Sequence, residues 1–258
     1  MIKRLSQYFH TDVARQLLNL VAILAAFGTN VLANVAPIGG LTIGEISNQI
    51  FKDVLITPAN YAFAIWGVIY LGLISLAVYQ ALPKQKQNPT LRRMGYLLAL
   101  SSLAQIGWVF AFQYRLFALS LLAMLGVLLP LIGIYLRLGI AIRRVGWQDR
   151  WFVFRPISIY LGWISVATIV NVALVLYNWD WSGGAIGGQK WTVIMVIVAA
   201  ILATIVNTQR SDAAYTLVIV WALVAIAVRH ANTLVISATA GGLAIALFLL
   251  VIFKPGVR

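Results

Sequence analysis

The sequence contains no cysteine, and only six of its 258 residues are acidic. The missing cysteines exclude disulfide bonds, thiolate nucleophiles and cysteine-bound metal ions. Charged residues make up 10% of the chain, against roughly a quarter in soluble domains, so there is too little charge to cover a water-facing surface. The chain is also 62% hydrophobic, with a mean hydropathy of +0.94. This composition predicts a protein whose outer surface faces lipid.

Eight apolar stretches follow one another along the chain, separated by short polar segments. Backbone exposed to lipid must satisfy its own hydrogen bonds, which leaves helices or a closed barrel. The stretches are continuous and about 20 residues long, the length at which a helix crosses roughly 30 Å of hydrocarbon. We therefore predict an all-α fold, a polytopic membrane helix bundle with about eight transmembrane helices. The predicted spans are residues 16–36, 58–82, 94–113, 116–138, 156–177, 191–208, 213–229 and 233–253.

Basic residues are distributed unevenly between the two sides that these spans define. With the N-terminus inside, fifteen of the 19 Lys and Arg residues lie inside, and only Lys52, Arg115, Lys190 and Arg229 lie outside. An excess of basic residues in cytoplasmic segments is the usual pattern for helical membrane proteins. It predicts an integral protein of the cell or inner membrane with both termini in the cytoplasm. It also accounts for the net charge of +13 without a nucleic-acid partner, because no soluble basic face is available.

The span at 156–177 carries polar and aromatic residues on one helical face. Tyr160, Trp163, Ala167 and Asn171 are spaced by three, four and four residues, which places them on the same side of a helix. A polar group that faces a neighbouring helix costs much less than one that faces lipid, so we expect this face inside the bundle. Two other spans repeat the arrangement, one with Ser101, Gln105, Trp108 and Phe112 and the other with Trp66, Tyr70, Leu73 and Ala77.

These three stripes have two interpretations. In the first, they are packing faces, where small residues and amides bring helices together. In the second, they line a pocket whose indole and phenol rings contact the faces of a flat ligand while amides orient it. Three such stripes on three helices, all in one half of the chain, favour the pocket.

Groups that carry catalysis, metal binding or ion coupling are scarce. The six carboxylates lie at or beyond the ends of the spans, whereas ion-coupled transporters usually keep a carboxylate within the membrane. Neither His10 nor His230 has a second ligand at metal-binding spacing, although each is a candidate axial ligand for haem. We therefore expect no enzymatic activity, no metal site and no obligatory cofactor.

The spacing Tyr160-x2-Trp163-x3-Ala167-x3-Asn171-x6-Asn178 resembles the signature near the last helix of the TspO/MBR family, the tryptophan-rich sensory proteins or translocator proteins. This motif is the most specific part of the resemblance, which covers roughly residues 15–178.

Two weaker patterns agree with it in order and in helix placement. Pro58, Trp66 and Tyr70 resemble the family's Pro…Trp-x3-Tyr pattern at the start of its second helix. Gln105-x2-Trp108 stands where the family usually has Asn-x2-Trp in its third helix. The chain departs from the family at Asn60 and Ala62, where aromatic residues are usual.

The resemblance implies a five-helix bundle over residues 1–178. The three spans over 179–258 have no counterpart in the short members of the family, and we interpret them as the three-helix C-terminal extension of a longer subfamily. It also implies a membrane binding protein or sensor for a flat hydrophobic ligand, a tetrapyrrole such as protoporphyrin or haem. The three tryptophans would supply ring faces, and the two amides would supply hydrogen bonds. The residues expected to line or support the pocket are Trp66, Tyr70, Gln105, Trp108, Tyr160, Trp163, Ala167 and Asn171.

The three C-terminal spans keep two other functions open. Eight spans exceed the need of a five-helix binder, which suits a facilitator that moves an organic solute without ion coupling. Alternatively, these helices dock onto a larger membrane complex. The small residues of Ser237-x3-Gly241 and Ala238-x3-Gly242 permit close helix contact, including contact in a homodimer. We expect Arg229 to extend to the outer interface by snorkelling.

Overall fold

The computed structural model describes the backbone of residues 2–253 and the side chains of residues 12–253. Every regular element in this part of the chain is helical, which confirms the predicted all-α membrane bundle. Eight long helices correspond one by one to the eight predicted spans. They are α1 (Ile2–Val35), α3 (Ile65–Ala81), α5 (Leu97–Gln113), α6 (Phe117–Leu138), α8 (Arg155–Asn178), α9 (Gly187–Arg210), α10 (Ala213–Arg229) and α11 (Leu234–Phe253).

The length and composition of these helices suit a bilayer. Six of the candidate spans, including those built on α1, α6 and α11, are long and apolar enough to cross a membrane. The other two, α5 and α10, have 17 residues each and are therefore about 26 Å long, slightly less than the hydrocarbon thickness. Large apolar side chains such as Leu71, Leu122 and Leu234 are exposed on the outside of the bundle, where lipid replaces water around them.

Short helical elements fill several of the connections. They are α2 (Ile43–Glu45), the π-helix η1 (Ile46–Ile50), the 3-10 helices η2 (Asn60–Ala64), η3 (Pro83–Gln85) and η5 (Gly184–Ile186), α4 (Pro89–Met94), α7 (Trp147–Asp149) and the π-helix η4 (Arg150–Phe154). Local chemistry explains two of them. Thr42 and Glu45 form a capping box at the start of α2, and the Asn88 side chain caps α4, with Pro89 in its first turn.

The break between α4 and α5 sets the start of one predicted span. The span predicted to begin at residue 94 begins at Leu97, because Gly95 adopts a φ of +61° and ends α4. Only glycine adopts this backbone conformation without steric cost. The chain therefore turns before it enters α5.

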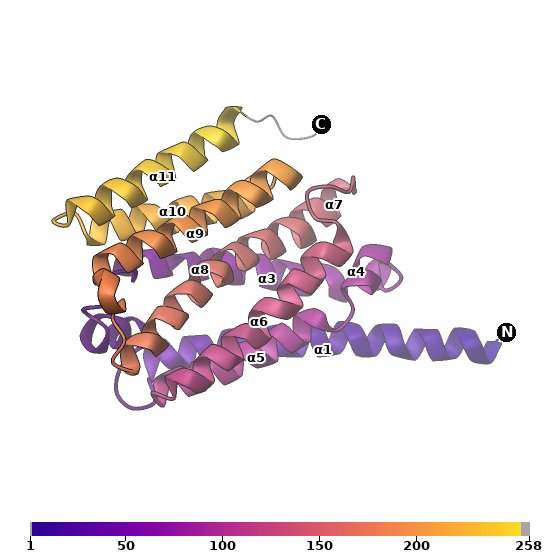
Figure 1. Ribbon diagram of the computed structural model, residues 1–258. Helices are drawn as coiled ribbons and strands as arrows, with labels where there is room; N and C mark the ends of the chain where they lie inside the picture. Colours follow the sequence, from indigo (N-terminus) through magenta and orange to yellow (C-terminus); the bar gives the residue numbers. More distant parts are fainter. Residues whose placement is uncertain (1, 254–258) are drawn as a thin grey trace.

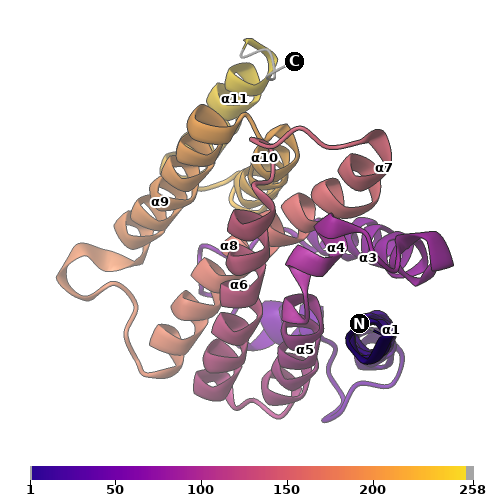
Figure 2. The same ribbon diagram turned by 90° about the vertical axis from the view of Figure 1, so that its right-hand side faces the viewer.

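Helix α8 lies at the centre of the bundle and contacts α3, α6, α9 and α10. Helices α9, α10 and α11 pack against one another above the first five (Figure 1). Gly162 allows α10 to approach α8 closely, because a Cβ at this position would lie 3.1 Å from the Tyr215 carbonyl oxygen and 3.1 Å from Val218 Cβ. The predicted boundary between residues 178 and 179 falls at the end of α8, and the extension beyond it packs directly on that helix (Figure 2).

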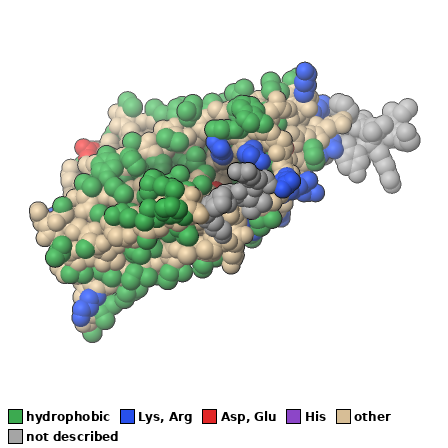
Figure 3. Space-filling view, turned by 90° about the horizontal axis from the view of Figure 1, so that it is seen from above, with side chains coloured by type: hydrophobic (Ala, Val, Ile, Leu, Met, Phe, Trp, Pro, Cys, Tyr) green, Lys and Arg blue, Asp and Glu red, His purple; other side chains and the backbone are tan. Residues whose placement is uncertain are grey.

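The two ends of the bundle differ in charge. The basic end consists of the connections at residues 82–96 and 139–154, and it carries most of the arginine and lysine residues between helices. On the face drawn in Figure 3, most Lys and Arg side chains gather toward one end of the molecule, with a separate group at the other end. The opposite end contains the long connection at residues 36–64. We call it the cavity end, after the cavity described below that residues of this connection line. Which end faces the cytoplasm stays a prediction.

Candidate functional site

A cavity of about 60 Å³ lies between α3, α5, α6 and α8 near the cavity end. Its walls come from the N-terminal part of α3 and the C-terminal parts of α5 and α8, which the fold brings together although they lie far apart in the sequence. The lining is mostly aliphatic and aromatic, and among the described residues none that lines it is charged. An apolar cavity with a few polar groups is the usual environment of a hydrophobic ligand.

Five of the eight predicted site residues line this cavity: Trp66, Trp108, Trp163, Ala167 and Asn171. Trp108 and Trp163 are 8% and 3% exposed, so both indoles face the interior rather than lipid. The three stripes predicted from sequence thus converge on one space. Whether these residues contact a ligand stays a prediction.

Two polar groups of the cavity wall, the Trp108 indole N–H and the Asn171 amide, are already paired. The Trp108 Nε1–H donates to Asn171 Oδ1 over 2.8 Å, and Asn171 Nδ2 donates to Ser120 Oγ over 3.1 Å. These bonds fix the amide and the indole at adjacent points of the wall, because a buried polar group without a partner costs free energy. The cavity therefore presents mainly ring faces, with one oriented amide.

The other three predicted residues, Tyr70, Gln105 and Tyr160, do not line the cavity but form a hydrogen-bonded chain beside it. The Tyr160 hydroxyl donates to Gln105 Oε1 over 2.6 Å, and Gln105 Nε2 donates to the Tyr70 hydroxyl over 2.5 Å. The Tyr70 hydroxyl in turn donates to the Ala26 carbonyl of α1 over 3.3 Å. All three side chains are buried. The chain links four helices behind the cavity and holds their spacing.

Ring contacts connect this chain to the wall. Trp66 stacks on Tyr70 at a centroid distance of 5.5 Å and meets Tyr160 edge-on at 6.2 Å. On the other side, Phe63 meets Trp163 edge-on at 6.2 Å. Such offset and edge-on arrangements are the favourable ones for aromatic pairs. The wall is therefore a set of mutually supported rings.

The segment that covers the cavity was not predicted from the sequence. Ile43, Ser47 and Pro58, all in the connection between α1 and α3, line the cavity and are buried. The π-helical turn of η1 places Ser47 there. Elements of three to five residues have no detectable hydrophobic periodicity, so apart from Pro58 in the family pattern no signal marked this segment.

Arg229 has hydrogen-bond partners that the sequence did not indicate, whereas its expected extension to the outer interface stays a prediction. Its Nη1 donates to Asn48 Oδ1 over 2.7 Å and to the Pro58 carbonyl oxygen over 3.2 Å. Both partners belong to the segment that covers the cavity. The half-buried guanidinium thus acts as a charged donor to two oxygen atoms of this segment.

The histidines lie in different surroundings. His10 falls outside the described side chains. His230 follows α10 and is 9% exposed. Burial lowers the pKa of His230, and the adjacent Arg229 lowers it further. Within the part of the chain that the structure describes, no group of three His, Asp or Glu residues is arranged to hold a metal ion.

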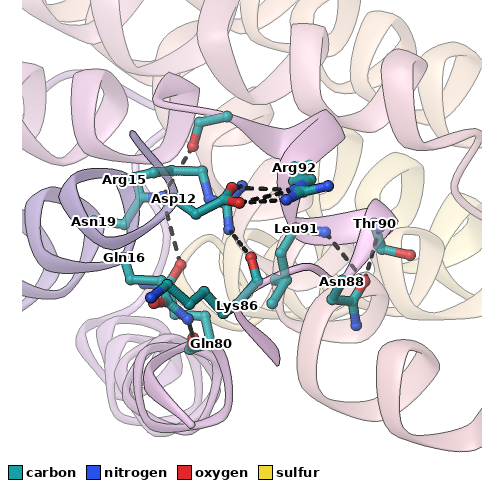
Figure 4. Close-up of polar contacts among 11 residues, drawn as sticks. Asp12, Arg15, Gln16, Asn19, Gln80, Lys86, Asn88, Thr90, Leu91 and Arg92 are labelled. Atoms are coloured by element: carbon teal, nitrogen blue, oxygen red, sulfur yellow. Dashed lines mark hydrogen bonds and ion pairs between the residues drawn. The ribbon is translucent and has the colours of Figure 1, made fainter. Parts of the chain in front are cut away.

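A charged cluster at the basic end was also missed by the sequence reading (Figure 4). Asp12 on α1 pairs with Arg15 at 2.9 Å and with Arg92 of α4 through two further bonds of 3.1 Å. Arg15 also donates to the Lys86 carbonyl oxygen over 3.1 Å. Nearby, Asn19 donates to the Gly95 carbonyl oxygen over 2.9 Å. The cluster fastens α1 to the connection between α3 and α5.

A second polar cluster lies at the same end around Asp149. Its carboxylate accepts hydrogen bonds from the Tyr79 hydroxyl at 2.8 Å, Asn88 Nδ2 at 3.0 Å and the Thr90 hydroxyl at 2.6 Å. The donors come from α3, α4 and the residue before α4, whereas Asp149 belongs to α7. Sequence spacing gives no indication of this contact, because the partners are about 60 or 70 residues away.

These features define a class: an integral membrane protein with a bundle of eight apolar helices and an aromatic-lined cavity among its first five. A comparison with protein-family models matches residues 16–253 to the family described as TSPO-like protein. The chain belongs to this family, which confirms the resemblance inferred from the motifs. The match continues beyond residue 178 and includes the three C-terminal helices. Comparisons with curated proteins and with solved structures found no match.

Proposed function

We propose that this protein is a membrane-embedded receptor or sensor that binds a flat hydrophobic ligand of the tetrapyrrole type in the cavity. The observation that carries the proposal is the convergence of Trp66, Trp108 and Trp163 on one uncharged space. Membership of the TSPO-like family supports a binding or sensing role in the membrane.

The chemistry of the wall suits a planar conjugated ring. Indole rings offer large, rigid apolar faces that stack on aromatic ligands at little cost in side-chain entropy. Asn171 supplies the one amide on the wall, and its hydrogen bonds to Trp108 and Ser120 are exchangeable for bonds to a ring nitrogen or a polar substituent. We assign the site binding rather than a reaction.

Size sets a condition on this binding. The cavity is about 60 Å³, whereas ligand pockets usually measure roughly 300–1,000 Å³. A macrocycle therefore fits only after part of the wall has moved. The helices are joined by the ring contacts and the hydrogen-bonded chain described above, so the covering segment at residues 43–58 is the part best suited to move.

A titration of protoporphyrin into the protein in lipid nanodiscs, followed by the porphyrin's own absorbance, tests the proposal. We expect saturable one-to-one binding that the double variant Trp108→Ala, Trp163→Ala weakens by at least tenfold. The matched control is Trp147→Ala, Trp179→Ala, because these two indoles are 65% and 62% exposed and lie away from the cavity. Equal affinity for all three proteins would contradict the proposed binding site. No binding to any of them would contradict protoporphyrin as the ligand.

The same protein reconstituted into liposomes allows binding to be distinguished from transport. A receptor takes up porphyrin in proportion to the amount of protein. Continued flux across the bilayer would instead identify a facilitator.

A further inference from the structure

The segment that covers the cavity is attached to the C-terminal extension. Residues 43–58 contribute Ile43, Ser47 and Pro58 to the cavity lining, and η2 follows directly. Helix α10 contacts η2 although more than 150 residues separate them in the sequence. The extension therefore reaches the ligand site through its cover as well as through α8.

Three hydrogen-bonding positions on α10 make this attachment. The Ala225 carbonyl oxygen accepts from the Ala59 N–H over 3.1 Å. The Trp221 Nε1–H donates to the Ala62 carbonyl oxygen over 3.1 Å, and the indole meets Tyr61 edge-on at 5.3 Å.

The last position is Arg229, whose bonds to Asn48 and Pro58 connect two points of the cover to one guanidinium. Trp221, Ala225 and Arg229 follow one another at four-residue intervals and thus share a face of α10. We call these three residues the α10 clasp.

The clasp satisfies backbone groups that the cover cannot satisfy alone. The Pro58 carbonyl and the Ala59 N–H belong to a non-helical stretch, where no helix of their own pairs them; the Ala62 carbonyl also accepts from the Ile65 N–H. In an apolar environment such groups require partners, and α10 provides them. Removal of one clasp bond shifts the cover toward conformations in which other partners, such as water, replace α10.

We propose that the α10 clasp holds the cavity closed and that Arg229 and Trp221 are positioning residues that set how readily the cover opens to a ligand. The extension is then a regulator of access to the site of the first five helices. This inference rests on the proposed function only in taking the cavity as the ligand site.

Cysteine accessibility tests the clasp without any ligand. The chain has no cysteine, so Ser47→Cys introduces a single thiol at a position that lines the cavity and is 4% exposed. In nanodiscs, we compare its rate of modification by a water-soluble maleimide with the rate in the same variant carrying Arg229→Gln. Loss of a charge-assisted hydrogen bond predicts a rate increase of about tenfold.

Two further variants separate the clasp from general effects of charge and folding. Arg115→Gln is the matched control, since Arg115 is an exposed arginine in the connection between α5 and α6, and it should leave the rate unchanged. Arg229→Lys keeps a cationic donor and should restore most of the protection. Equal rates in Arg229→Gln and Arg115→Gln would overturn the proposal.

If Arg229→Gln does not fold, Trp221→Phe tests the same proposal in the same measurement. It removes the Nε1–H donor but keeps a ring against Tyr61, and we expect a smaller rise in the same rate. No rise would overturn the proposal.

Protoporphyrin dissociation is then measured in the same variants and should accelerate in parallel with modification. If modification changes but porphyrin does not bind at all, the clasp stands and the ligand assignment fails.

Discussion

The two ends of the bundle are fastened in different ways. At the basic end, Asp12, Arg15 and Arg92 form ion pairs, and the Asp149 carboxylate accepts three side-chain hydrogen bonds. At the cavity end, the indole of Trp221 and the guanidinium of Arg229 join η2 and the cover to α10. The charged clusters connect several helices at once, whereas the clasp connects one helix to a loop.

This difference indicates where the molecule can move. Regions with buried charged networks open only with most of the fold, because separated charges in a low-dielectric interior are costly. Regions with few hydrogen bonds and short helical turns open at low free energy. We therefore expect the basic end to hold the bundle together while the cavity end admits the ligand.

Asp12→Asn breaks the basic end and should have the largest effect on stability. Arg15 would remain buried, with a side chain only 6% exposed, and without its counter-ion. Breaking a buried ion pair in this way costs about 3–5 kcal/mol. The free energy of unfolding, measured by denaturant titration in mixed micelles, checks this value.

Asp53→Asn is the control for that measurement. Asp53 is an exposed carboxylate at the cavity end, where loss of charge should cost less than about 1 kcal/mol. Similar decreases in the free energy of unfolding for Asp12→Asn and Asp53→Asn would contradict the proposed difference in stability between the two ends.

Gly162→Ala tests the contact between α8 and α10, through which the extension packs against the first five helices. The new Cβ would lie 3.1 Å from the Tyr215 carbonyl oxygen and from Val218 Cβ, so α10 must shift, at a cost of about 1–3 kcal/mol. Gly67→Ala is the matched substitution on α3, where a Cβ meets nothing within 4 Å and should stabilise the helix by about 0.5–1 kcal/mol. Thermal unfolding of both variants should show opposite shifts, and shifts of the same sign would contradict close α8–α10 packing.

Ala167→Leu fills the cavity without removing an aromatic ring. Ala167 lies on the cavity wall, so the larger side chain occupies the space that the ligand needs. We expect protoporphyrin affinity to fall at least tenfold, while stability changes by less than about 3 kcal/mol. Ala246→Leu, on the exposed face of α11, should bind like the parent protein. Unchanged affinity in Ala167→Leu would separate the cavity from the binding site.

Acidification should produce the smallest effect, at the cavity end. Because the pKa of His230 is lowered in the folded protein, the unfolded state binds more protons as the pH falls below about 6.5. The contribution of neutral His230 to the free energy of unfolding is thus present above that pH. It is lost on acidification, because protonation places a second positive charge beside Arg229. Melting temperatures from pH 8 to pH 5 should fall less steeply in His230→Gln. Identical slopes would show that His230 makes no such contribution.

The fold was largely predictable because apolar length determines transmembrane helices almost independently of tertiary contacts. The span predicted at 213–229 coincides with α10, since Asp212 caps its start and His230 lies just beyond its end. The aromatic stripes identified the cavity wall for a related reason: a face that repeats every three or four residues must turn toward other helices.

The cover, the clasp and the charged clusters were not predictable in the same way. Arg229 bonds to residues 171 and 181 positions earlier, and no local pattern encodes such a distance. Gln105 was expected to supply hydrogen bonds at the pocket, yet both ends of its amide bond to tyrosines. The sequence indicated that Gln105 is a polar residue on the inward face of its helix. Its hydrogen-bond partners, however, depend on how three helices pack together.

The cavity itself offers the most direct test of ligand binding. In Ser47→Cys, an N-ethylmaleimide adduct places a bulky group within the lining, whereas the same adduct in Ser182→Cys lies in the exposed connection before α9. We expect modification at position 47 to abolish protoporphyrin binding and modification at position 182 to leave it unchanged. Full binding with position 47 completely modified would contradict a ligand site between α3, α5, α6 and α8.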